Sequence, residues 1–244
     1  MMKLTDSEHH INIIILLDNN LHRSDLIAGW GFSCLVKVPD RVIMFDCGNN
    51  GEALLHNMSL LGIAPEKVDD VILSHFHYDH LGGLPYILKN NRKVTIYMPS
   101  SFPREFKQYA TNNGIEYTEI NTVTEIYDGV FLTGELGDQP AEQALVVSTT
   151  KGLAVITGCA HPGIVNIAKY VKEKIASKIH LMLGGFHLLE ETLSQIHHVA
   201  DNLIELGVEK VAPCHCSGEI ARKVFSERYT SNYIDCATGN IIKI

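Results

Sequence analysis

One short stretch of the chain, Ser74-His75-Phe76-His77-Tyr78-Asp79-His80, carries four side chains that can bind a metal ion. In an extended backbone His75 and His77 point the same way, because side chains alternate with period two, so both imidazoles can reach one ion. If a helix begins after Tyr78, Asp79 and His80 turn toward a second position nearby. Neutral imidazole and carboxylate are ligands that Zn²⁺, Mn²⁺ and Fe²⁺ accept. The stretch therefore predicts a transition-metal site.

Further ligands must come from distant parts of the chain, because one loop cannot enclose a metal ion. Three single histidines qualify, since each lies in a loop directly after an apolar, strand-like run: His161, His187 and His215. Loops at strand ends are where folds of strands and helices place functional residues. Cys214 and Cys216 flank His215 and could bind metal as thiolates, although buried cysteines more often serve as small packing residues.

The elements expected to position these residues alternate between strands and helices. Apolar runs bounded by turn residues predict strands at 11–17, 32–38, 41–46, 71–73, 93–98, 130–133, 144–148, 154–157, 179–183 and 208–212, with a short strand closing the chain. Helical spacing predicts helices at 52–61, 84–88, 103–110, 164–175, 193–206 and 219–225. Each half thus has a run of strands followed by strand–helix units. This order fits two sheets face to face with helices outside.

Composition narrows the class of protein. The 244 residues are 45% hydrophobic and 20% charged, which is typical of a globular chain, and α/β sandwiches of this length commonly form one domain. A net charge of −8 argues against binding to a nucleic-acid backbone. No apolar run reaches the roughly 18 residues that a membrane span needs. The polar N-terminus has no export signal, so we expect a cytoplasmic protein with its cysteines reduced.

The motif His75-x-His77-x-Asp79-His80, followed by the isolated His161 and His215, resembles the metallo-β-lactamase superfamily of metal-dependent hydrolases over nearly the whole chain. More narrowly, the segments 18–20, 31–33, 158–163, 184–188 and 215–218 resemble the stand-alone group that includes archaeal dihydropterin-type phosphate synthases. The resemblance implies a four-layer αββα sandwich, with two mixed sheets face to face and helices outside. It also implies one domain over 1–244, with pseudo-symmetric halves of about 1–125 and 126–244.

The resemblance further implies a site for two divalent ions, with Zn²⁺ expected and Mn²⁺ or Fe²⁺ as alternatives. The implied ligands of the first ion are His75, His77 and His161, and those of the second are Asp79, His80 and His215. Asp46, at the end of an expected strand, would hold a ligand imidazole from outside. Asp79 would also orient a metal-activated hydroxide, which makes it a catalytic residue.

The chain departs from the superfamily pattern at the bridge between the two metals. An aspartate usually follows the strand that precedes the last histidine, but here that strand is followed by Gly184-Gly185-Phe186-His187. A neutral imidazole has one free lone pair and cannot bridge two cations. His187 is therefore interpreted as a ligand to one metal or as a catalytic donor to substrate, against the alternative of a loop histidine packed on Phe186.

The function expected from these residues is hydrolysis of a small, anionic, phosphorylated or ester-like metabolite by metal-activated hydroxide. One alternative is a transferase that joins a pterin diphosphate to a phosphoribosylated arylamine, and another is a non-catalytic or redox metal-binding protein. We expect Asn19, Trp30, Tyr78 and Phe186 to wall the substrate cavity. The expected partner is a small molecule rather than a nucleic acid or a membrane, and the sequence does not define an oligomeric state.

Overall fold

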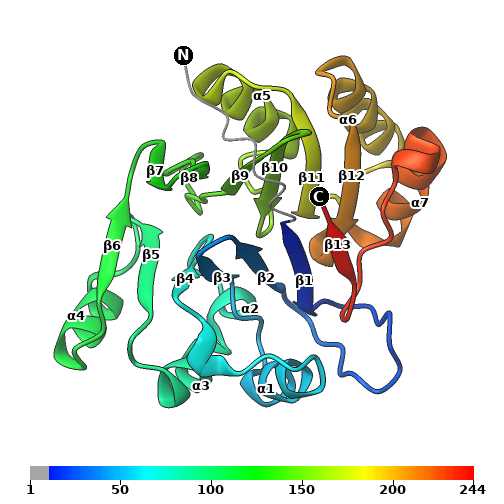
Figure 1. The fold of residues 1–244 in the computed structure, drawn as a ribbon. Coiled ribbons are helices and arrows are strands. Elements are labelled where there is room, and N and C mark those ends of the chain that lie inside the picture. Colours follow the sequence, from blue (N-terminus) through cyan, green and yellow to red (C-terminus); the bar gives the residue numbers. More distant parts are fainter. Residues whose placement is uncertain (1–10) are drawn as a thin grey trace.

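The computed structural model describes residues 11–244, whose strands form two sheets packed face to face (Figure 1). The first ten residues of the expected domain lie outside this part. The strands are β1 (Asn12–Leu17), β2 (Ser33–Val38), β3 (Arg41–Phe45), β4 (Asp70–Ile72), β5 (Thr95–Pro99), β6 (Tyr117–Ile120), β7 (Thr124–Tyr127), β8 (Val130–Leu132), β9 (Leu145–Thr149), β10 (Gly152–Thr157), β11 (Ile179–Gly185), β12 (Lys210–Cys214) and β13 (Ile241–Lys243).

The helices are α1 (Gly51–Leu60), α2 (Tyr78–Leu81), α3 (Leu84–Asn90), α4 (Arg104–Asn112), α5 (Ile164–Ile175), α6 (Leu193–Glu205) and α7 (Gly218–Tyr229). Three short 3₁₀ turns, η1 (Pro65–Lys67), η2 (His215–Ser217) and η3 (Thr230–Asn232), complete the elements. No helix within residues 11–244 is long and apolar enough to cross a membrane.

Both sheets are mixed. The first has the order β13-β1-β2-β3-β4-β5-β6, in which β3 to β6 are parallel and the remaining pairs antiparallel. The second has the order β12-β11-β10-β9-β8-β7, with β10, β11 and β12 parallel. The first sheet takes its strands from the chain up to Ile120 and the second from Thr124 to Cys214, and β13 returns from the end of the chain to pair with β1.

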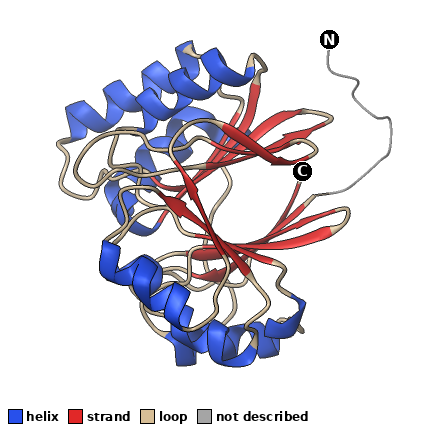
Figure 2. Cartoon of the chain, turned by 90° about the vertical axis from the view of Figure 1, so that its left-hand side faces the viewer, coloured by secondary structure: helices blue, strands red, loops and turns tan. Residues whose placement is uncertain are grey.

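Three apolar layers explain the sandwich, as Figure 2 shows with helices outside both sheets. Along β1, Ile13 and Ile15 pack between the sheets, whereas Ile14 and Leu16 pack in the layer that includes α1 and α3. This alternation follows from the period-two geometry of a strand buried on both faces. A third cluster fills the space between the second sheet and α5, α6 and α7. The predicted four-layer αββα architecture is confirmed.

Two strands were missed by the sequence prediction. In β6 and β7 most side chains are half-buried or exposed, and neither segment has a continuous apolar run. Both lie at the edge of a sheet, where polar residues face solvent and the hydrophobic pattern weakens. All the strands and helices that the sequence predicted are present, with ends displaced by a few residues.

Candidate metal centre

Loops from both sheets bring the predicted ligands to one edge of the sandwich. The stretch from His75 to His80 follows β4, and His161, His187 and His215 follow β10, β11 and β12. The chain turns into helix α2 directly after His77, one residue earlier than the sequence predicted. Because neighbouring parallel strands end at the same edge, residues more than a hundred positions apart become neighbours.

The first ligand group consists of His75, His77 and His161, whose candidate ligand atoms lie within 4.8 Å of one another. His75 Nε2 lies 3.1 Å from His77 Nδ1, so the two imidazoles converge on one point. The ring of His161 comes within 4.6 Å and 5.0 Å of those of His75 and His77, measured between centroids. All three predicted ligands of the first metal are thus brought together.

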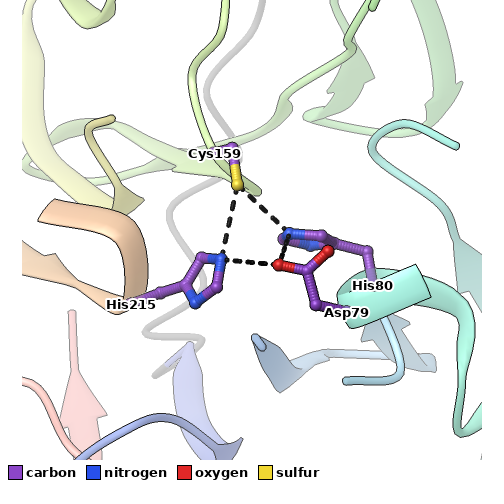
Figure 3. A group of neighbouring side chains, drawn as sticks. All are labelled: Asp79, His80, Cys159 and His215. Atoms are coloured by element: carbon purple, nitrogen blue, oxygen red, sulfur yellow. Dashed lines mark hydrogen bonds and ion pairs between the residues drawn. The ribbon is translucent and has the colours of Figure 1, made fainter. Parts of the chain in front are cut away.

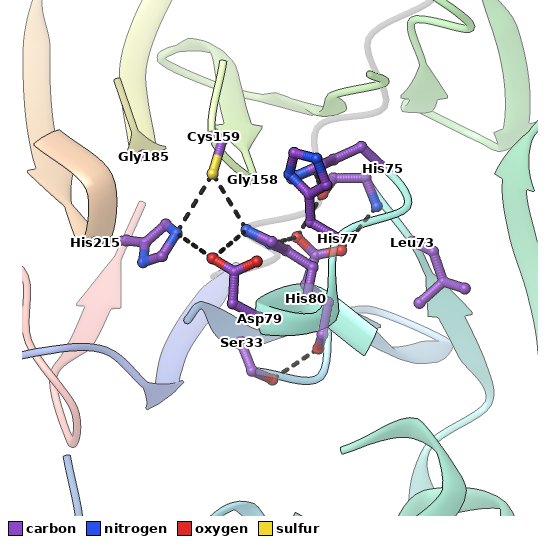
Figure 4. Close-up of polar contacts among 12 residues, drawn as sticks. Ser33, Leu73, His75, His77, Asp79, His80, Gly158, Cys159, Gly185 and His215 are labelled. Atoms are coloured by element: carbon purple, nitrogen blue, oxygen red, sulfur yellow. Dashed lines mark hydrogen bonds and ion pairs between the residues drawn. The ribbon is translucent and has the colours of Figure 1, made fainter. Parts of the chain in front are cut away.

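The second ligand group consists of Asp79, His80, Cys159 and His215 (Figure 3). Asp79 Oδ2 lies 3.3 Å from His215 Nε2 and 3.7 Å from His80 Nε2. Three members of the group are the predicted ligands of the second metal. Cys159 was not predicted. The two groups adjoin, since the rings of His75 and His80 are 4.3 Å apart (Figure 4).

The donor set fits divalent metal ions. In three of the ligand histidines, a neighbouring side chain holds the ring nitrogen that faces away from the cluster. His80 Nδ1 is 2.7 Å from Asp46 Oδ2, and His161 Nδ1 is 2.8 Å from a carboxylate oxygen of Glu142. His75 Nδ1 is 2.8 Å from Ser74 Oγ, and that hydroxyl donates to Asp46. Such outer partners fix the tautomer that leaves the inner nitrogen free for a metal ion.

Asp46 lies where the sequence prediction placed it, outside the ligands and fully buried. It accepts hydrogen bonds from the Ser74 backbone at 2.7 Å and the Ser74 hydroxyl at 2.6 Å. Burial raises the pKa of Asp46 to about 7, although the neighbouring His75 and the Ser74 hydrogen bonds oppose the shift. One carboxylate therefore orients His80 directly and His75 through Ser74.

Glu142 holds the loop that carries His161. This buried carboxylate accepts hydrogen bonds from the backbone N–H groups of Gly158, Cys159, Ala160 and His161, at 2.8 to 3.1 Å. Burial opposes its ionisation, but the hydrogen bonds from His161 and the attraction of His75 outweigh it and hold the pKa of Glu142 well below its usual range. The ionised carboxylate thus fixes both the loop backbone and the imidazole of His161.

The buried imidazoles are poised in the neutral form that metal binding requires. Burial, assisted by the charge of His80, lowers the pKa of His75 to about 3. Burial and the neighbouring His215 lower the pKa of His80 to about 3 as well. Both rings therefore offer a lone pair near neutral pH without first losing a proton.

The backbone is strained around the cluster. Six non-glycine residues of the described part have a positive φ, and four of them lie at the site: Asp46, Ala160, His187 and His215. Such left-handed conformations persist where the surroundings over-determine them, and they concentrate at functional sites. Here the strain accompanies the abrupt turns that aim side chains into the space between the sheets.

The residues expected to wall the cavity have different places. Trp30 and Tyr78 are 48% and 74% exposed, and Trp30 Nε1 donates to Asp79 Oδ2 at 3.1 Å. Asn19 instead holds His215, since its amide donates to the His215 carbonyl at 3.1 Å. Phe186 is only 1% exposed and packs edge-on against Phe225, and it also lines the cavity described below, as expected.

A cavity of about 640 Å³ opens beside the cluster, between α5 and α6. His161 and His187 line its inner end, and Lys169, Asn166 and His198 contribute polar atoms elsewhere. The His187 ring lies 4.5 Å from that of His161, and its ligand atoms group with those of Cys159 and His161. His187 therefore stands between the cluster and the cavity, which is large enough for a small metabolite.

Sequence reasoning missed three residues. Cys159 stands two positions before His161, a spacing that could have been treated like that of His75 and His77. Glu142 and Asp18 had no such signal: Asp18 accepts a hydrogen bond from the His215 backbone N–H at 2.7 Å, and only the fold brings these residues together. Of the two other cysteines considered, Cys214 packs between the sheets and Cys216 is absent from the ligand groups found within residues 11–244.

Comparison with known proteins agrees with this geometry. The family model described as the metallo-beta-lactamase superfamily matches residues 31–165. The chain is 30% identical to the 7,8-dihydropterin-6-methyl-4-(beta-D-ribofuranosyl)-aminobenzene-5'-phosphate synthase of Methanocaldococcus jannaschii, over 87% of this chain and 89% of that protein.

Solved structures show the same fold. Tm1679, described as a metal-dependent hydrolase of the beta-lactamase superfamily, superposes with a TM-score of 0.81 and 30% identity over 96% of this chain and 99% of its own. The metallo-beta-lactamase fold protein YhfI from Bacillus subtilis superposes with a TM-score of 0.71 over 97% of this chain and all of its own, at 14% identity, which supports the fold alone.

Proposed function

The chain belongs to the metallo-β-lactamase superfamily, and from that premise we propose that it is a binuclear metal-dependent hydrolase of a small, anionic, phosphorylated or ester-like metabolite. The observation that carries the proposal is the pair of adjoining ligand groups at the sheet edge. His75, His77 and His161 would hold one ion, and Asp79, His80 and His215 the other. Mixed imidazole, carboxylate and thiol donors favour Zn²⁺ over harder cations.

When bound, divalent ions lower the pKa of a coordinated water to about 7 and polarise the oxygen of an electrophile. The protein's own residues supply the rest. The Trp30 indole donates to Asp79 Oδ2, which leaves Oδ1 to orient a water in the site by accepting its hydrogen bond. The burial of His75 and His80 removes bulk water from one side of the cluster and strengthens its electrostatic interactions.

His187 is proposed to contact the substrate. It is the exposed member of its ligand group and lines the cavity next to His161. Lys169, on the same cavity, offers a positive charge to an anionic substrate. A histidine donor at a reacting oxygen stabilises the charge that develops there. We also propose a small-molecule partner rather than a nucleic acid or a membrane, in keeping with the net charge of −8, and a cytoplasmic location.

A second candidate is the transferase that joins a pterin diphosphate to a phosphoribosylated arylamine. It is favoured by the 30% identity to the archaeal synthase, which extends over most of both chains. The same ligand groups would serve it, because displacement of diphosphate also places negative charge on oxygens that metal ions stabilise.

One preparation tests both candidates. The protein is purified with zinc, its metals per chain are measured, and it is incubated with a panel of phosphodiesters, phosphomonoesters and lactones, and separately with pterin diphosphate plus the arylamine phosphate. Turnover of the panel that is lost in Asp79→Asn supports the hydrolase, and condensation without hydrolysis supports the transferase. A zinc-supplemented preparation that binds no metal would refute both.

A further inference from the structure

The side chain of Cys159 occupies the space between the two ligand groups. Its Sγ lies 3.2 Å from His80 Nε2 and 3.3 Å from His215 Nε2 (Figure 3). It also belongs to the group with His161 and His187, in which all ligand atoms lie within 4.8 Å of one another. Within residues 11–244, Cys159 is the one residue whose ligand atom lies within 4.8 Å both of the Asp79, His80 and His215 ligand atoms and of those of His161 and His187.

The last residue of β11, Gly185, gives no alternative side chain for this position. A Cβ atom at Gly185 would come 2.4 Å from the Gly158 carbonyl oxygen and 2.6 Å from Cys216 Sγ, so no larger residue fits there without displacing backbone. Figure 4 shows Gly185, Gly158 and Cys159 at the ends of the neighbouring strands β11 and β10, above His80 and His215. The space between the groups is therefore entered from the β10 loop, through Cys159.

The β10 loop is built to hold Cys159 in place. The Cys159 backbone N–H donates to Glu142 at 2.9 Å, and those of its neighbours Gly158 and Ala160 donate to the same oxygen at 3.1 Å and 2.8 Å. Ala160 has a φ of 61°, a conformation that non-glycine residues adopt only under constraint. Cys159 itself is 4% exposed. Its orientation is thus set by the fold, with little freedom to turn away.

The chemistry of sulfur suits a shared position. A neutral imidazole offers one lone pair, whereas a thiolate has three and can bind two cations at once. Without a thiolate, two divalent ions would face the imidazoles of the cluster and a single carboxylate, Asp79. Binding the ions would displace the thiol proton to solvent, and the resulting anion would add a second negative charge among the ligands.

We propose that Cys159, as a thiolate, bridges the two metal ions. The inference rests on the proposed binuclear site and adds the ligand that joins its halves. A bridging Cys159 differs from a site in which each ion has its own ligands. If Cys159 bridges, its removal weakens the binding of both ions rather than of one.

X-ray absorption at the zinc edge tests the bridge on the unaltered protein loaded with two zinc ions per chain. A bridging thiolate gives about one sulfur neighbour per zinc at about 2.3 Å, whereas a thiolate bound to one ion gives about half a sulfur per zinc. The first value supports the proposal. The second value, or the absence of sulfur, overturns it while leaving the binuclear site intact. Failure to bind two zinc ions counts against the proposed function itself.

Cobalt substitution gives a second readout with matched variants. The Co²⁺ protein should show a thiolate-to-cobalt charge-transfer band that is lost in Cys159→Ser and retained in Cys216→Ser, a buried neighbour outside the ligand groups. Cys159→Ser should also bind each metal at least about 10-fold more weakly, the smallest loss that even an outer partner causes. A band that survives in Cys159→Ser and disappears in Cys216→Ser would overturn the assignment, and circular dichroism would confirm that both variants are folded.

Discussion

Replacement of Glu142 by glutamine should destabilise the protein more than any conservative change at its surface. The carboxylate accepts five hydrogen bonds from one loop: Oε1 from the N–H groups of Gly158, Cys159 and Ala160, and Oε2 from the N–H and Nδ1 of His161. A glutamine oxygen can retain the first three. Its NH₂ group faces the two His161 donors and accepts from neither.

The magnitude follows from the two His161 donors, the backbone N–H and Nδ1, that lose their acceptor. A buried donor left without a partner costs about 1–3 kcal/mol, so Glu142→Gln should lower the free energy of unfolding by about 2–6 kcal/mol. That is a large part of the roughly 5–15 kcal/mol by which a domain is stable. Because His161 also loses the partner of its Nδ1, zinc affinity should fall about 10- to 100-fold.

The assay is urea denaturation at pH 7 followed by circular dichroism, on chelator-treated and zinc-loaded protein, with zinc affinity measured by chelator competition. Glu173→Gln is the matched control, since Glu173 is exposed and, among residues 11–244, pairs only with its neighbour Lys174. It should change stability by less than about 0.5 kcal/mol. The reasoning would be refuted by a Glu142→Gln protein that unfolds at the same urea concentration as the control and binds zinc as tightly.

Three further predictions follow from the same network. In metal-free protein, the difference in unfolding free energy between wild type and Glu142→Gln should stay constant above pH 4.5, the ordinary pKa of glutamate. It should shrink as the pH falls from 4.5 toward the lowered pKa of Glu142 in the folded state. A difference that shrinks between pH 7 and pH 5 would contradict the assignment. Asp46→Asn should weaken zinc binding about 10- to 100-fold in chelator competition, because Asp46 holds the outer nitrogen of His80, whereas Asp40→Asn in the exposed turn between β2 and β3 should have no effect. His187→Ala should keep its metals per chain and lose about 10²–10³ in kcat/KM, as expected for a substrate donor; loss of a metal ion would instead make His187 a ligand.

The sequence predicted the parts of the protein that depend on neighbouring residues. The strands and helices could be predicted because buried strands and amphipathic helices have periodic apolar patterns, and their four-layer arrangement was implied by the resemblance to the superfamily. The close spacing of His75, His77, Asp79 and His80 likewise revealed half of the candidate ligands, since period-two geometry and a helix start at Tyr78 suffice to bring them together.

Only the tertiary structure decided how the site is completed. Glu142 and Asp18 carry no local signal, because their partners lie 16 to 197 positions away. Cys159 has only its spacing to His161, since its partner His80 lies 79 positions away and meets it only when the ends of β4 and β10 come to one edge. The same limit explains Asn19, which holds His215 rather than walling the cavity. The periodic pattern of a strand or helix tells which face a side chain lies on. Its contact partner is set by how the two sheets pack, and no local stretch of sequence records that packing.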